Sequence, residues 1–360
     1  MSDGVMTVRR ISVADAIRMF DPQTPLAELA AAADAVCRRL HPDPVRTYHI
    51  DRNINYTNIC TAGCQFCAFS VPPDDPRGQL IDRKTLYTKI DETLSLGGDQ
   101  ILLQGGLHPE LPLEWYESLL IGIRERYPTI NIHGFGPPEI VHFARQSGLS
   151  VETVLRRLRA AGLGSLPGGG AEILADRVRR IVAPKKATAD EWINVCRTWH
   201  LLGGRGSATM MFRHLETIAE RVEHLDRIRS LQDETGGFTA FIPWTFQPRH
   251  TPLAAVRTVG DEICGEAMNG SSVKYDTWDY LRTLAVSRLF LDNVRNVQVS
   301  WVTQGPEIGE LGLRFGANDF GSLMIEENVV AAAGTRFRMT REEIERRIRR
   351  AGFEPRLRRS

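Results

Sequence analysis

The strongest constraint on the fold is an alternation of short β-rich runs with longer amphipathic segments, which begins near residue 47. The β-rich runs span residues 47–57, 100–106, 131–136, 162–169, 206–212, 238–246, 296–302 and 313–321. Helical spacing marks most of the intervening segments, for example 82–97, 113–127, 151–162, 189–203 and 218–235. Eight β-then-α units predict an α/β protein with a parallel (β/α)8 TIM-type barrel.

An open doubly wound sheet is the alternative to the barrel. Two observations favour the barrel: no dinucleotide fingerprint follows the first run, and several runs end in Gly and polar residues. We therefore predict one barrel domain over residues 46–340. Residues 1–45 form a helical extension with Ser12 and Thr24 as caps, and residues 341–360 form a charged helix and tail with a solvated face.

Composition excludes several classes of function. The chain has 45 basic and 44 acidic residues, and its net charge of +1 gives no footprint for nucleic acid or an anionic membrane. No apolar run is long enough to span a bilayer, and the N-terminus lacks a signal-peptide core. We expect a cytoplasmic protein whose partner is a small-molecule substrate bound in a pocket.

Three of the six cysteines, Cys60, Cys64 and Cys67, lie within eight residues. A structural zinc site usually has four ligands, which His49 or His108 could complete. A thioredoxin-type site uses only the last two cysteines and leaves Cys60 without a role. The third interpretation is a [4Fe–4S] cluster on three thiolates, which leaves one iron open to a small molecule.

The C-x3-C-x2-C spacing, with Phe66 before the last cysteine, resembles the signature of the radical S-adenosylmethionine (SAM) superfamily. The resemblance implies a radical SAM type of barrel. It also implies that Cys60, Cys64 and Cys67 hold the [4Fe–4S] cluster, and that the open iron chelates the methionine part of SAM. One electron from the cluster then cleaves SAM to a 5′-deoxyadenosyl radical.

Further segments resemble one branch of this superfamily, which acts in the futalosine route to menaquinone and in deazaflavin formation. They are NYTNICTAGCQFCAF, LLQGGLHPELPLEWYESLL, SLPGGGAEIL, ATMMFRHLET, HLDRIRSLQDETGGFTAFIPWTFQP and GANDFGSLMIEENVV. The chain most resembles the dehypoxanthine futalosine cyclases; aminofutalosine synthase and deazaflavin synthase-like enzymes remain alternatives, as does a zinc-stabilised barrel. The chain departs from the branch at Arg213, where Gly is usual, and in HGFGPPEI.

The resemblance implies a specific reaction on dehypoxanthine futalosine. The adenosyl radical abstracts the hydrogen at ribose C4′, and the carbon radical closes a ring onto the aromatic system. This chemistry needs reacting atoms held about 3–3.5 Å apart and a one-electron donor such as flavodoxin or ferredoxin.

The resemblance and the strand ends together suggest cofactor contacts. Gln104, Gly105 and Gly106 end the second run, where paired glycines let a ligand approach the backbone closely. We expect this turn to contact the SAM amino group, the alternative being a tight turn. Glu172, after three glycines, is expected to bind the SAM ribose or amino group, with a helix N-terminal acid as the alternative.

Three further residues are catalytic candidates. His214 and Glu216 follow the fifth strand and could orient substrate hydroxyls or take the final proton. Asp319 is expected to end the eighth strand and to reach the substrate, with a helix cap as the alternative.

Overall fold

The computed structural model describes residues 10–255 and 273–360. Its strands are β1 (Val45–His49), β2 (Asp51–Asn55), β3 (Gln100–Gln104), β4 (Asn131–Gly134), β5 (Gly206–Phe212), β6 (Phe238–Thr245), β7 (Asn296–Val297), β8 (Asp319–Ser322) and β9 (Glu354–Leu357). The larger helices are α2 (Leu26–Leu40), α3 (Arg83–Ser95), α4 (Leu113–Arg126), α5 (Pro137–Ser147), α6 (Val151–Ala161), α8 (Ala189–Leu201), α9 (Ile218–Thr235), α10 (Val273–Phe290) and α14 (Arg341–Arg350). Shorter helices are α1 (Val13–Met19), α7 (Asp176–Val182), α11 (Trp301–Gln304), α12 (Pro306–Gly312), α13 (Val329–Ala332) and the 3-10 turn η1 (Pro252–Ala255).

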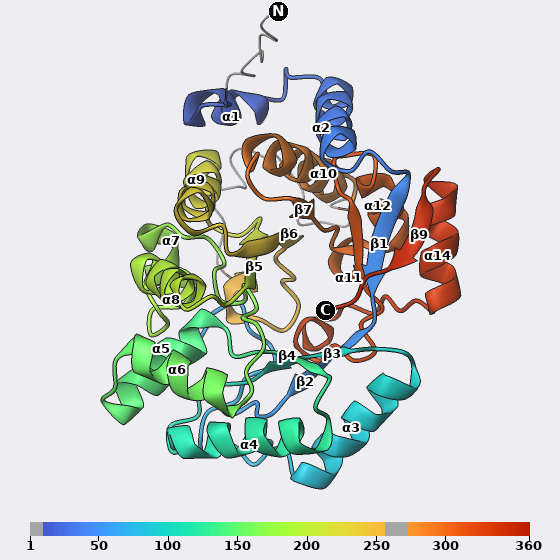
Figure 1. The fold of residues 1–360 in the computed structure, drawn as a ribbon. Coiled ribbons are helices and arrows are strands. Elements are labelled where there is room, and N and C mark those ends of the chain that lie inside the picture. Colours follow the sequence, from blue (N-terminus) through green and yellow to red (C-terminus); the bar gives the residue numbers. More distant parts are fainter. Residues whose placement is uncertain (1–9, 256–272) are drawn as a thin grey trace, which may run out of the picture.

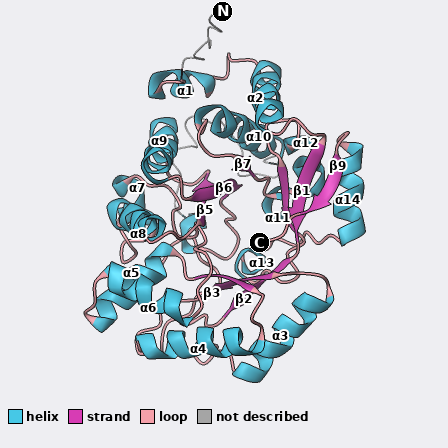
Figure 2. Ribbon diagram, in the orientation of Figure 1, coloured by secondary structure: helices cyan, strands magenta, loops and turns pink. Residues whose placement is uncertain are grey.

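The strands form three parallel three-stranded sheets, in the orders β8-β1-β9, β2-β3-β4 and β5-β6-β7. Only Ile50 separates β1 from β2, so one run of chain enters two sheets. Helices surround these sheets (Figures 1 and 2). The α/β class is as predicted, but the sheets are small, and among the described residues they do not join into one closed sheet.

Several predicted strands differ in extent from the sequence pattern. Residues 162–169 form no strand; they make only single parallel bridges, from Ser165 to His133 and from Leu166 to Gly206. The run at 296–302 is a strand only over β7, because α11 begins at Trp301. The glycine-rich composition of 162–169 explains the first difference, since glycine weakens strand pairing.

Two buried clusters of apolar side chains hold the helices on the sheets. One joins β2, β3 and β4 to α3, α4, α5 and α6, with Ile54, Leu103 and Ile132 fully buried. The other joins the remaining sheets to α8, α9, α10 and α14. Successive side chains of a strand point to opposite faces. Where one residue faces the helices, the next residue along the strand faces the inside of the fold.

The N-terminal extension is helical as predicted, and α2 packs on α10 (Figure 1). Ser12 caps α1 through a capping box. Thr24 does not cap α2, because Pro25 holds the N-cap position and Thr24 donates to the Arg18 carbonyl instead. None of the helices in the described part of the chain is both long and apolar enough to cross a membrane.

The C-terminal segment contains the predicted charged helix with a solvated face, and a short strand that was not predicted follows it. α14 buries Ile344 and Ile348, and β9 follows it and pairs in parallel with β1. The Arg358 N–H donates to the Tyr48 carbonyl at 2.7 Å, and its side chain donates to Asp319 at 3.0 Å. The apolar stripe of α14 is narrow, and a strand after it has no pattern of its own in the sequence.

We predict that Arg358→Ala lowers the free energy of unfolding by about 1–2 kcal/mol, because it removes a charge-assisted hydrogen bond to Asp319. The value is below that of a fully buried pair, since the Arg358 side chain is 38% exposed. Urea unfolding measures the effect. Arg356→Ala, an exposed position in β9 two residues earlier, is the matched control, and equal losses in the two variants would contradict the prediction.

Candidate active site

The cysteine loop leaves the end of β2 and is fixed by backbone hydrogen bonds to separate parts of the fold. The Cys60 N–H donates to the Val71 carbonyl at 2.9 Å, and the Gln65 N–H donates to the Val182 carbonyl at 2.8 Å. Cys60, Cys64 and Cys67 are half-buried free thiols. The loop therefore presents three thiols from a braced backbone.

Burial of the thiols disfavours their charged thiolate form, whereas nearby N–H donors and a cation favour it. Burial raises the pKa of Cys60, while N–H groups of Ala62 and Leu107, which donate to its sulfur, lower it in part. Burial raises the pKa of Cys64 to about 12, and the Lys186 ammonium acts in the opposite direction. The N–H donors and the cation are ready to stabilise sulfur charge once iron displaces the protons.

The donor set fits an iron–sulfur cluster better than a single zinc ion. Among residues 10–255 and 273–360, no three His, Cys, Asp or Glu side chains are gathered as ligands of one ion. His49 accepts or donates toward Asp99 at 2.9 Å, and His108 accepts from the Glu110 N–H, so both histidines have other partners. In a cluster each thiolate binds a different iron atom, and three thiolates leave one corner for another ligand.

The turn after β3 packs directly on the cysteine loop. A Cβ atom at Gly106 would lie 2.1 Å from the Ile59 carbonyl oxygen and 2.9 Å from the Cys60 Cβ. The Gly106 N–H donates to the Thr57 carbonyl at 3.0 Å. Glycine is required here by the approach of the loop itself, whatever ligand the turn also contacts.

The glycine run before Glu172 lies beside the same turn. A Cβ atom at Gly169 would lie 2.6 Å from the Gln104 amide nitrogen. The glycine run before Glu172 therefore lies against the turn after β3 at Gln104.

Glu172 is 4% exposed and pairs with two cations, Lys186 at 3.0 Å and Arg179 at 3.4 Å. It is not the helix N-terminal acid considered as an alternative, because α7 begins at Asp176. Burial alone would lower the pKa of Lys186, but Glu172, followed by Cys64, raises it above its ordinary value. The pair places a fixed cation beside the cysteine loop.

Sequence reasoning missed Lys186 and Arg179. Lys186 Nζ lies 5.3 Å from the centroid of the Phe66 ring, so the residue before Cys67 is tied to the same charged group. The pair Lys185–Lys186 between two helices looks like a solvated basic site; only the second lysine turns inward. No local signal distinguishes the two.

His214 and Glu216 brace the turn between β5 and α9. His214 is 3% exposed, and its two ring nitrogens face the Met211 carbonyl and the Leu215 N–H. Glu216 accepts from the Arg213 and His214 N–H groups and from Arg221. Burial opposes its charge, but His214 and Arg221 lower its pKa to about 2. Both side chains have their polar atoms occupied within the protein.

Asp319 begins β8 and does not end it, so the predicted position at the catalytic strand ends is wrong. Its carboxylate accepts from Thr47 at 2.6 Å, from the Gly321 N–H at 2.8 Å and from Arg358. The strand begins later than the run at 313–321 predicts, because α12 ends at Gly312, a turn follows it, and β8 starts only at Asp319. Asp319 therefore lies at the N-terminal end of β8, whereas the cysteine loop follows the C-terminal end of β2.

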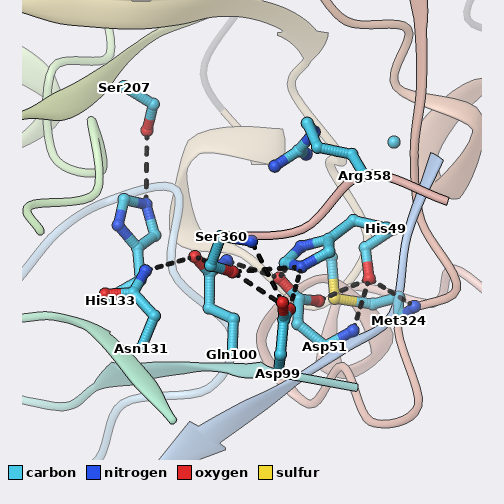
Figure 3. A network of polar contacts seen from close by, with 12 residues as sticks. His49, Asp51, Asp99, Gln100, Asn131, His133, Ser207, Met324, Arg358 and Ser360 are labelled. Carbon is cyan, nitrogen blue, oxygen red and sulfur yellow. Dashed lines mark hydrogen bonds and ion pairs between the residues drawn. The ribbon is translucent and has the colours of Figure 1, made fainter. Parts of the chain in front are cut away.

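A chain of polar contacts crosses the fold at the starts of the strands (Figure 3). It includes the contacts His49–Asp99 (2.9 Å), Gln100–Asp51 (3.2 Å), Asn131–Gln100 (2.6 Å), Asn131–Ser165 (3.1 Å) and His133–Ser165 (2.7 Å). Ser360 joins it by donating to Asp99 at 3.1 Å. The interior of the fold is therefore polar here, unlike a barrel filled with branched apolar side chains.

Four non-glycine residues with positive φ follow strands or the glycine run: Phe135 (54°), Glu172 (41°), Arg213 (67°) and Met324 (50°). Such backbone costs about 1–3 kcal/mol per residue and gathers at functional sites. Arg213, where the resembling branch usually has Gly, occupies the left-handed region that glycine favours. Three of these residues follow β4, β5 and β8, and the fourth is Glu172 itself, after the glycine run.

The chain belongs to the radical SAM superfamily. The model of that superfamily matches residues 54–228, and the CofH/MqnC C-terminal region matches residues 235–360. Two relatives are named cyclic dehypoxanthine futalosine synthase, one from Halalkalibacterium halodurans and one from Streptomyces coelicolor. Each is 44% identical to this chain over 96% of its length, and the matches cover 89% of the first relative and 83% of the second.

Other relatives carry a different name. The 5-amino-6-(D-ribitylamino)uracil–L-tyrosine 4-hydroxyphenyl transferase of Methanococcoides burtonii is 38% identical over 85% of this chain and 82% of its own. Among solved structures, methylornithine synthase (PylB) matches with a TM-score of 0.71 and 16% identity over 97% of this chain and 95% of that one. HydG from Carboxydothermus hydrogenoformans matches with a TM-score of 0.68 and 14% identity. The match covers 96% of this chain and 76% of that one. These two structures show the same fold.

A pH prediction follows from His133. Burial lowers its pKa to about 4 from 6.5, so the unfolded chain takes up this proton before the folded protein does. Its contribution to stability is present above pH 6.5 and is lost as pH falls toward 4. By pH 5 the loss is about 2 kcal/mol relative to neutral pH.

Urea unfolding of His133→Gln at pH 7.5 and pH 5 tests this. Between pH 7.5 and pH 5, the free energy of unfolding of the wild type should fall by about 2 kcal/mol more than that of the variant. All other histidines are common to both proteins, so their titration cancels in the comparison. Equal losses would show that His133 titrates normally.

Proposed function

We propose that this radical SAM enzyme converts dehypoxanthine futalosine to cyclic dehypoxanthine futalosine, in the futalosine route to menaquinone. The single observation that carries the proposal is the 44% identity, over 96% of the chain, to two relatives with that name. The braced three-thiol loop supports it, because the reaction needs a cluster with one open position.

We propose that Cys60, Cys64 and Cys67 hold a [4Fe–4S] cluster and that SAM binds beside it. Gln104, Gly105, Gly106, Glu172 and Phe66 are the proposed cofactor contacts. When bound, the cluster and SAM together supply a 5′-deoxyadenosyl radical. The protein's part is to orient both groups and to exclude water from them.

We also propose that the strands form a (β/α)8 barrel of the radical SAM kind. The single bridges His133–Ser165, Leu166–Gly206 and Gln298–Asp319 support this order, since they continue the parallel pairing between the three sheets. The barrel would bring the ends of β2, β3 and β5 together above a polar interior.

The proposed roles of the three catalytic candidates now differ from one another. His214 and Glu216 act in the proposal by fixing the β5–α9 turn that carries Arg213, whose side chain lies 3.5 Å from Asp279. A direct role in the final proton transfer would require their hydrogen bonds to open. Asp319 has a structural role in the proposal, through Thr47 and Arg358.

A second candidate is the hydroxyphenyl transferase activity in the names of the relatives that are 37–39% identical. Aminofutalosine synthase is a further alternative from the sequence resemblance. Incubating the reduced, anaerobic protein with each substrate separates them. Cyclic dehypoxanthine futalosine with free 5′-deoxyadenosine supports the cyclase, whereas a tyrosine-derived adduct or a purine-bearing adduct contradicts it.

The electron donor is proposed to be a small one-electron carrier such as flavodoxin or ferredoxin. A chemical reductant can replace it in the product assay, so the donor does not limit the test.

We predict that Cys64→Ala abolishes cluster binding and SAM cleavage, because a ligand of the open-corner cluster is removed. Cys196→Ala is the matched control, since Cys196 is a buried thiol in α8 away from the loop. Iron and sulfide analysis after anaerobic reconstitution, with SAM cleavage, measures both. Equal loss in the two variants would show that the loop thiols are not the ligands.

A further inference from the structure

We propose that Glu139 is a positioning residue of the cofactor site, where its carboxylate joins three segments that surround the cysteine loop. The proposal rests on the proposed cofactor site but not on the identity of the substrate. Glu139 lies in α5, in the HGFGPPEI segment, and is 5% exposed.

The Glu139 carboxylate receives hydrogen bonds from three elements. The Tyr56 hydroxyl donates to Oε1 at 2.7 Å, and the Gly105 N–H donates to the same oxygen at 3.1 Å. The Gly136 N–H donates to Oε2 at 2.7 Å and closes the N-terminus of α5. One side chain thus ties the end of β2, the turn after β3 and a helix start.

Each of these donors leads directly to the proposed cofactor contacts. Tyr56 lies four residues before Cys60, and its ring fills the space over Gly105, where a Cβ atom would lie 2.5 Å from it. Gly105 precedes the glycine that touches the cysteine loop. A shift of the carboxylate would therefore move the loop and the turn relative to each other.

The third donor connects the same carboxylate to the glycine run. A Cβ atom at Gly136 would lie 3.2 Å from the Gly169 carbonyl oxygen and 3.5 Å from the Gln104 amide nitrogen. The segments that carry Gln104 and Glu172 therefore both pack against the start of α5 at Gly136.

A helix cap alone does not explain this residue. The capping-box acid of α14, Glu343, accepts from the Thr340 N–H at 2.8 Å and is 40% exposed. Glu139 also accepts from the N-cap N–H of its own helix, but it is buried. It accepts two further hydrogen bonds, from the residues that directly follow β2 and β3. Burying a carboxylate is costly unless hydrogen bonds compensate it, so its position depends on all three donors.

The test compares Glu139→Gln with Glu343→Gln in reconstituted protein. Glutamine keeps the shape of the side chain but has one acceptor oxygen, so it cannot receive all three hydrogen bonds. We expect Glu139→Gln to bind iron and sulfide as the wild type does and to bind SAM about tenfold more weakly, measured by equilibrium dialysis. Glu343→Gln should leave SAM affinity unchanged.

Tyr56→Phe provides a second variant if Glu139→Gln does not fold, because it removes one donor and keeps the ring. It should weaken SAM binding by about threefold with iron content unchanged. Unchanged SAM affinity in the folded variants would overturn the proposal and leave Glu139 as a helix cap. Dialysis uses no futalosine substrate, so a wrong substrate assignment would not affect this result.

Discussion

The close approach of the turn after β3 to the cysteine loop is the constraint on which the rest of the site depends. Gly106 has no room for a side chain because the Ile59 carbonyl and the Cys60 Cβ occupy that space. Together with the hydrogen bonds from the Cys60 N–H to the Val71 carbonyl and from the Gln65 N–H to the Val182 carbonyl, this contact fixes the position of the loop beside the turn.

Buried charge gives the site its second constraint. Glu172 is held by Lys186 and Arg179, and all three are largely removed from water. Such a group is costly to bury, and its cost is offset only while every partner stays in place. The arrangement therefore favours one geometry of the glycine run and keeps a cation next to Cys64 and Phe66.

Polar side chains also line the interior farther from the loop. His133 remains neutral at physiological pH because burial lowers its pKa to about 4, so it can exchange hydrogen bonds with Ser165 without carrying charge. The tail residues Arg358 and Ser360 lie in the same region (Figure 3), where Ser360 donates to Asp99. The interior at this end of the strands therefore differs from the layers of branched apolar side chains that fill many parallel barrels.

The sequence allowed the α/β class, the cysteine loop and the two glycine turns to be predicted, because each depends on local spacing. Lys186, Arg179 and Glu139 could not be found in this way, since their partners lie on other elements and their own segments look like ordinary loops or caps. The glycine and asparagine before Asp319 imitate a strand end, whereas Asp319 begins β8. The strand in the tail has no signal of its own, because β9 depends on pairing with β1, which local pattern does not report.

Electron paramagnetic resonance of the anaerobically reconstituted, reduced protein, recorded with and without SAM, tests the central claim most directly. The proposed cluster, held by three thiolates with one open corner, predicts a reduced iron–sulfur signal that changes when SAM is added, because SAM would bind at that corner. A protein that carries no such signal, or a signal that SAM leaves unchanged, would contradict the account.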